Sequence, residues 1–138
     1  MLAVLWFDLM FDVQVVGHRE RELPGPVLAS ICAYYGRVTT AARPMNRLIA
    51  LVMISTLVAI VVQIAAGDSP RWVSWTSLAL AGSAVALAGG HTVPSAVRLG
   101  ARVDAPAVQS RLARSIFRDH VFCVAAITSL LAIQLSFG

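Results

Sequence analysis

Long apolar blocks separated by short polar segments dominate the chain, and these blocks do not alternate with polar residues as a half-buried strand would. Residues 48–66 contain no charged side chain and, as a helix, are long enough to cross roughly 30 Å of hydrocarbon. The pattern predicts an all-α, polytopic membrane protein in which four transmembrane helices form a bundle within a single membrane domain, residues 1–138. The predicted spans are about 2–16, 47–66, 72–97 and 117–137.

The ends of these blocks carry helix-boundary signals. Asp68-Ser69-Pro70 predicts a tight hairpin between the second and third spans, with Asp68 or Ser69 capping a helix that starts at Pro70. The first block has no basic segment before it and contains two aspartates, so we expect a structural helix and not a cleaved signal peptide.

Two segments between the spans have amphipathic patterns. Residues 107–116 place three apolar side chains on one face, and residues 27–38 place five there: Val27, Ile31, Tyr34, Tyr35 and Val38. Both segments are predicted to be interfacial helices along the inner leaflet. They either cover the mouth of the bundle or gate the entry of a lipid-soluble substrate, with Tyr34 and Tyr35 as the aromatic part of that gate.

Positive charge is concentrated between the first and second blocks and between the third and fourth. The sequence has 11 basic residues, all arginine, against 7 acidic ones, and only Arg71 lies away from those two regions. The positive-inside rule therefore predicts a multi-pass protein of the cell membrane with both long loops in the cytoplasm and both termini outside. The exclusive use of arginine fits either lipid-headgroup binding or genome composition. The lipid bilayer is the expected partner, and nucleic acid is not.

Asp8 and Asp12 lie one helical turn apart in the first block. A carboxylate near the centre of a membrane helix costs about 2.5–3.5 kcal/mol, so both need partners, protons or a function. The predicted topology brings Asp12, His91 and the pair Asp119-His120 to a similar depth, with Asp8 one turn further out.

This cluster has two interpretations. As a site, Asp8, Asp12, His91 and His120 would hold iron, copper or zinc, or else His91 and His120 would act as catalytic bases oriented by Asp12. No Glu-x-x-His, His-x-x-x-His or Cys-x-x-Cys spacing identifies a metal. As packing, Asp12 would pair with His91 or His120, and Asp8 would be a neutral acid bonded to a serine or threonine hydroxyl.

Further features bear on packing. Gly82, Ala86 and Gly90 form a stripe of small residues on which a neighbouring helix can approach closely. Pro94 cannot donate to the carbonyl of Gly90, which weakens the turn at residues 89–91. The two cysteines, Cys32 and Cys123, are expected to be free thiols. Hydrolase elbows and phosphate-binding loops are absent from the sequence.

Several segments occur in an order that is typical of a known family. They are Tyr34-Tyr35-Gly36-Arg37, Arg43-Pro44-Met45-Asn46, His91-Thr92-Val93-Pro94 and the start of the last span at residues 114–120. In this layout the chain resembles the small four-helix membrane proteins related to anthrone oxygenases, with Thr92, Pro94 and His120 at matching positions. Ile116, Phe117 and Arg118 stand where that family usually has tryptophan and asparagine. The resemblance implies oxidation of a membrane-soluble polycyclic or quinone-like substrate, with His120 as the reactive residue.

Three functions follow as hypotheses. The first is an accessory or structural subunit that docks onto other membrane subunits through the Gly82 stripe, Asp8 and Asp12. The second is a membrane oxidoreductase for a lipid-soluble substrate that uses Asp12, His91 and His120. The third is a proton or metal conduit through Asp8 and Asp12, which requires a homo-oligomer.

Overall fold

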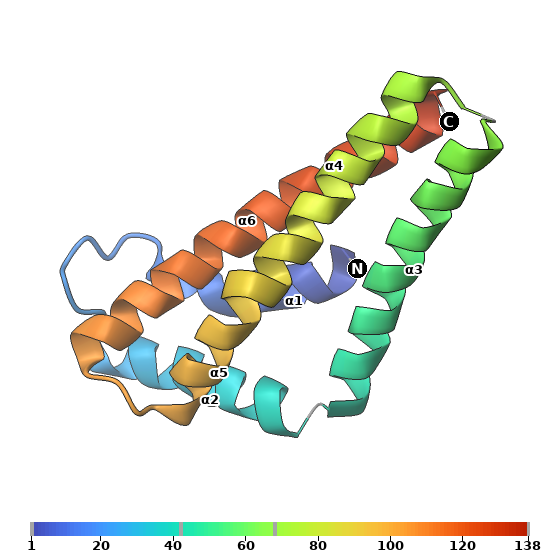
Figure 1. Cartoon of the computed structure of the whole chain (residues 1–138). Helices are drawn as coiled ribbons and strands as arrows, with labels where there is room; N and C mark the ends of the chain where they lie inside the picture. Colours follow the sequence, from blue (N-terminus) through green and yellow to red (C-terminus); the bar gives the residue numbers. More distant parts are fainter. Residues whose placement is uncertain (1, 42, 68, 138) are drawn as a thin grey trace.

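The computed structural model describes residues 2–41, 43–67 and 69–137, and these residues form helices joined by short turns, with no strand among them. Figure 1 shows α4 and α6 running side by side as the long axis of the molecule, with α2 near one end of that axis and α1 extending from that end towards its middle. The elements are α1 (Leu2–Asp12), η1 (Val13–Val15), α2 (Gly25–Thr40), α3 (Arg43–Ala66), α4 (Arg71–Leu87), η2 (Ala88–Thr92), α5 (Val93–Ala101) and α6 (Pro106–Phe137).

Three helical stretches within the described chain are long and apolar enough to cross a membrane. They are Asn46–Ala66, Arg71–Ala101 and Pro106–Phe137. The structure therefore confirms the predicted all-helical class and has a helix of sufficient length and apolarity at each of the second, third and fourth predicted spans. The four-span bundle is not confirmed.

The first predicted span differs from the helix that the structure has there. Its helix, α1, has only 11 residues, which corresponds to about 16 Å of helix, well short of roughly 30 Å of hydrocarbon. Leu2 and Leu5 pack on the α4 and α6 residues Ala84 and Ile127, and Figure 1 shows the start of α1 level with the middle of α4. The apolar composition of α1 therefore reflects packing along the other helices, and the predicted location of both termini on the non-cytoplasmic side is not shown.

The second predicted interfacial helix, residues 107–116, is not a separate element. It forms the first third of α6, a continuous helix of 32 residues from Pro106 to Phe137. The sequence has no proline or glycine between residues 107 and 137, so nothing interrupts the backbone hydrogen bonds where the amphipathic part meets the apolar part. The first interfacial segment is confirmed as the separate helix α2.

The end of the molecule opposite the α3–α4 turn is held by a close crossing of α2 and α5. Gly36 and Gly100 meet there, and a Cβ added to Gly100 would lie 2.7 Å from the backbone nitrogen of Gly36. Ile31 and Leu99, both fully buried, belong to the core cluster beside this crossing. The crossing fixes the position of α2, and with it the directions of Tyr34 and Tyr35.

The chain from Arg71 to Ala101 is helical throughout, but its hydrogen-bond pattern changes at η2. Residues Ala88–Thr92 form a π-helical turn, and the backbone N–H of Val93 donates to the carbonyl of Ala88. Pro94 follows at once and has no N–H to donate to Gly90. The predicted weak turn at residues 89–91 is therefore confirmed as a π-bulge, a feature that is frequent at functional sites.

α3 and α4 form the predicted hairpin, but α3 is otherwise barely covered. Only 6% of its apolar window is buried, and Figure 1 shows it diverging from α4 and α6 away from the shared turn. Asp68 lies outside the described residues, and the Ser69 hydroxyl accepts a hydrogen bond from Gln63 instead of capping α4. A Cβ at Gly82 or Gly90 would meet nothing within 4 Å, so the small-residue stripe has no neighbour within the described chain.

Candidate functional site

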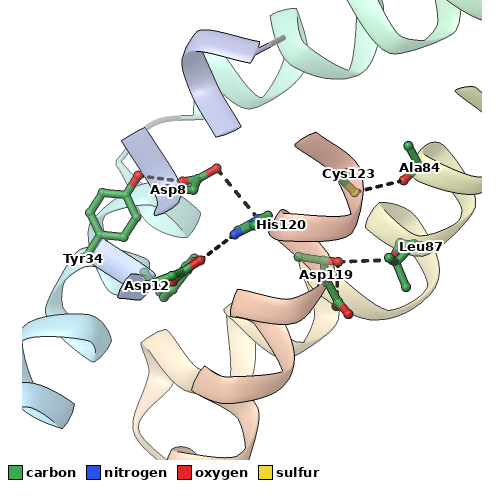
Figure 2. Close-up of polar contacts among 10 residues, drawn as sticks. Asp8, Asp12, Tyr34, Ala84, Leu87, Asp119, His120 and Cys123 are labelled. Atoms are coloured by element: carbon green, nitrogen blue, oxygen red, sulfur yellow. Dashed lines mark hydrogen bonds and ion pairs between the residues drawn. The ribbon is translucent and has the colours of Figure 1, made fainter. Parts of the chain in front are cut away.

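Asp12 is the centre of a buried polar cluster formed by α1, α2 and α6. Its side chain has no solvent exposure, and both of its carboxylate oxygens are engaged. Oδ1 accepts a hydrogen bond of 2.7 Å from the Tyr35 hydroxyl, and Oδ2 lies 2.6 Å from Nδ1 of His120. The pairing with His120 was one of the two predicted from the sequence, and Figure 2 shows both side chains directed towards each other across α1 and α6.

Asp8 lies one turn away on the same face of α1 and approaches the other side of the same imidazole. Its Oδ1 accepts a hydrogen bond of 2.6 Å from the Tyr34 hydroxyl, and its Oδ2 is 3.9 Å from His120 Nε2. The expected serine or threonine partner of Asp8 is thus replaced by a tyrosine. His120, only 9% exposed in its side chain, stands between the two carboxylates (Figure 2).

The two tyrosines of the predicted gate both act as hydrogen-bond donors to the aspartates. Tyr35 is buried, with 2% exposure, which excludes a role at an entrance. Tyr34 is half-buried and stacks on Phe11 with ring centroids 4.0 Å apart. Burial raises the pKa of both phenols far above its ordinary range, so both keep their protons and donate to the aspartates at neutral pH.

His91 belongs to a second carboxylate–histidine pair. Its Nδ1 lies 2.6 Å from Oδ2 of Asp119, and the hydroxyl of Thr92 donates to the same oxygen over 2.9 Å. The His91 side chain is 48% exposed, whereas that of Asp119 is 12% exposed. Asp119 and His120 are neighbours in α6, but they face different helices, so the structure does not bring His91 into the cluster around His120.

The predicted metal centre is not formed in the part of the chain that the structure describes. No group of three or more histidine, cysteine, aspartate or glutamate side chains is arranged there to hold a metal ion. Of the four predicted ligands, Asp8, Asp12 and His120 lie in one cluster, whereas His91 pairs with Asp119. The Asp12 oxygens are already occupied by Tyr35 and His120. The arrangement suits proton exchange better than iron, copper or zinc ligation.

The proton positions follow from the donor inventory. An ionised carboxylate only accepts, so the short contact with Asp12 places a proton on Nδ1 of His120. Nε2 then faces Asp8, which is close enough to come within hydrogen-bond range after a movement of about 1 Å. Tyr35, Asp12, His120, Asp8 and Tyr34 therefore form a continuous series of polar groups in which His120 lies between the two aspartates.

A groove of about 930 Å³ adjoins the second pair. His91 lines it together with four arginines, Arg98, Arg111, Arg114 and Arg118. Sequence reasoning predicted a basic membrane face but missed this concentration, although the spacing of the three α6 arginines places them on one helix face. Cys32 and Cys123 are free, as predicted, and both are buried; the Cys32 thiol donates to Gln109.

Comparison with known protein families, with curated proteins and with solved structures gives no match to this chain.

Proposed function

We propose that this protein transfers protons within the membrane during the oxidation or reduction of a lipid-soluble substrate, with His120 as the group that exchanges the proton. The observation that carries the proposal is the position of His120 between two carboxylates, each of which has its own tyrosine donor. Chains of aspartate and histidine at membrane depth are the usual form of a proton relay.

A purely structural cluster is a weaker explanation of these contacts. Buried ion pairs contribute little to stability compared with well-packed apolar residues of the same volume, because desolvation offsets the attraction. Here two aspartates, a histidine and two tyrosines occupy one site that leucine and phenylalanine would fill at less cost. The cluster is also asymmetric, since Asp12 and Tyr35 are closed off while Asp8 and Tyr34 are partly exposed.

That open end supports a lipid-soluble substrate. The stacked rings of Phe11 and Tyr34 lie beside the Asp8 carboxylate, and aromatic faces of this kind accept a planar ring by offset stacking. The resemblance to proteins related to anthrone oxygenases implies a polycyclic or quinone-like substrate and selects His120. We infer that the arginine-rich end faces the cytoplasm, from which protons would be taken up.

The test is whether the Asp8 carboxyl exchanges its proton. Infrared difference spectra of the protein in nanodiscs, recorded between about pH 5 and pH 8 in H₂O and D₂O, are expected to contain a carboxyl band that shifts with deuterium. Asp8→Asn should remove the band, and His120→Gln should change its pH dependence. His91→Gln is the matched control, because His91 belongs to the separate Asp119 pair, and should leave the band unaltered. A carboxyl region insensitive to pH and to deuterium would refute the relay.

A second candidate is the accessory subunit predicted from the sequence, and the exposure of α3 favours it. Only 6% of the apolar window of α3 is buried, so almost its whole circumference is available to lipid or to another subunit. Asp8 and Asp12 would have no part in docking, because both face inward. Cross-linking from a photoreactive residue at exposed Leu51 or Val58, in native membranes, should capture another subunit; capture of lipid alone at both positions would contradict this role.

A further inference from the structure

We propose that the groove between α5 and the start of α6 binds the headgroup of an anionic phospholipid, and that it prefers a headgroup carrying hydroxyl groups. The groove is independent of the proton relay, because Asp8, Asp12 and His120 do not line it. Four arginines, an unsatisfied carboxylate oxygen and the location of the groove along the helices support the proposal.

The first observation is the charge of the groove. Four arginines line it, and Asp104 is the one acidic residue among its lining side chains. Arg111, Arg114 and Arg118 recur at spacings of three and four residues and so share one face of α6, while Arg98 approaches from α5. Guanidinium groups bind phosphate in a bidentate manner and are weakly hydrated, which suits them to the headgroup layer.

The four arginines differ in the hydrogen bonds and ion pairs that they make within the protein. Arg114 donates to the backbone carbonyls of His18 and Glu20 and so holds the loop after η1 in place. Arg98 pairs with Asp104 over 2.8 Å. Arg111 and Arg118 are exposed and make no hydrogen bond or ion pair with the residues that the structure describes. Arg111 and Arg118 are therefore the two cations with charge left to bind an anion.

The second observation is an acceptor without a donor. Oδ2 of Asp104 is buried and has no hydrogen-bond partner within the described residues. A buried polar atom of this kind requires a partner from outside the chain. A second anion would be repelled by it, whereas a hydroxyl group would donate to it. Phosphate near Arg111 and Arg118 together with a hydroxyl near Asp104 is the chemistry of a glycerol headgroup.

The third observation is depth. α6 has 32 residues, about 48 Å of helix, so about a third of it extends beyond roughly 30 Å of hydrocarbon. Arg111 and Arg114 lie in that extension and Arg118 lies at its edge, at the end opposite the α3–α4 turn. Val108, Leu112 and Phe117 line the same groove and offer an apolar wall to the glycerol backbone and upper acyl chains. A soluble phosphate would gain nothing from that wall, which favours a lipid.

The experiment measures lipid retention by native mass spectrometry of the detergent-purified protein, with phosphatidylglycerol as the probe. Arg111→Gln/Arg118→Gln is compared with Arg19→Gln/Arg37→Gln, which removes the same charge from two exposed arginines outside the groove. Each arginine that contacts an anionic headgroup strengthens binding by about five-fold, so the groove variant should bind about 25-fold more weakly. The variant at Arg19 and Arg37 should lose little, because neither residue lines the groove. Equal losses in the two variants would overturn the site.

Further binding measurements with other lipids, a soluble phosphate and an Asp104 variant define the ligand. Phosphatidylcholine should bind far less than phosphatidylglycerol, and glycerol 3-phosphate should fail to displace the lipid; displacement would assign the groove to a soluble phosphate and overturn the lipid. Phosphatidic acid, which lacks headgroup hydroxyls, should bind less than phosphatidylglycerol. Asp104→Asn should remove that difference, and an unchanged preference in Asp104→Asn would overturn the role of its orphan oxygen. Unaltered thermal unfolding of each variant shows that the fold is retained.

Discussion

The buried carboxylate of Asp12 allows a quantitative test of the cluster by substitution with alanine. Asp12→Ala removes the partner of the Tyr35 hydroxyl at 2.7 Å and of His120 Nδ1 at 2.6 Å, and both partners stay buried. Breaking a buried pair by deleting one side destabilises by about 3–5 kcal/mol, because the remaining groups are left without partners. Two charge-assisted hydrogen bonds at about 1.5–3 kcal/mol each give a similar sum.

Asp8→Ala is the matched control on the same helix face. Asp8 accepts one hydrogen bond, from the half-buried Tyr34, and its other oxygen is 3.9 Å from His120. Its side chain is 14% exposed, so water can replace part of what is lost, and we expect a cost of about 1–2 kcal/mol.

The assay is reversible unfolding of both variants and the parent protein in mixed micelles, followed by circular dichroism. Ordinary hydrogen bonds between membrane helices contribute about 0.6 kcal/mol each, so two such bonds would give only about 1.2 kcal/mol. An Asp12→Ala cost at or below that value, or no larger than the cost of Asp8→Ala, would refute the reasoning that the Asp12–His120 pair is a desolvated charged pair.

Three other predictions concern the rest of the fold. Gly100→Ala should destabilise by about 1–3 kcal/mol in the same unfolding assay, because its Cβ would meet the Gly36 backbone at 2.7 Å; Gly82→Ala, with open space around it, should be neutral or stabilising, and equal effects would contradict the crossing. His91→Ala should cost only about 1 kcal/mol, since Thr92 still donates to Asp119, and a loss as large as that of Asp12→Ala would show that the two pairs are one network. Burial raises the pKa of the Cys32 thiol, so in a Cys123→Ser background its alkylation should be slow at neutral pH and should keep accelerating well above the ordinary thiol pKa of about 8.5; rapid alkylation of the folded protein would contradict its burial.

The long helices could be predicted from the sequence because their apolar blocks exceed the width of a membrane. The hairpin of α3 and α4, the helix α2 and the irregular turn before Pro94 follow from local signals of proline, glycine and periodicity. α1 could not be assigned in this way, since apolar composition is the same for a helix that spans and for one that packs beside the bundle. The continuity of α6 was hidden by the change from amphipathic to uniformly apolar pattern at about residue 117.

The sequence predicted several residues of the site but not which of them form hydrogen bonds with one another. Depth alone brought Asp12 and His120 together, because both lie near the cytoplasmic ends of the predicted spans 2–16 and 117–137; in the structure His120 lies near the middle of α6. The sequence predicts a gate at the two tyrosines because its periodicity identifies the apolar face of α2. The periodicity does not identify which helix packs against that face. That neighbour is set by the contact of Gly36 with Gly100, two residues far apart in the sequence. The groove could not be predicted because it forms only if Arg98 faces α6. That orientation depends on the turn before Pro106.

One turn of α6 explains why two carboxylate–histidine pairs form side by side without merging. Successive residues of an α-helix point about 100° apart, so Asp119 and His120 must address different neighbours. His120 meets α1, whereas Asp119 meets His91 and Thr92 of the π-bulge. A π-bulge adds one residue to a turn and so changes the direction of the side chains beside it. The bulge before Pro94 therefore directs His91 to Asp119 at the wall of the arginine groove, and it leaves His120 to the aspartates of α1.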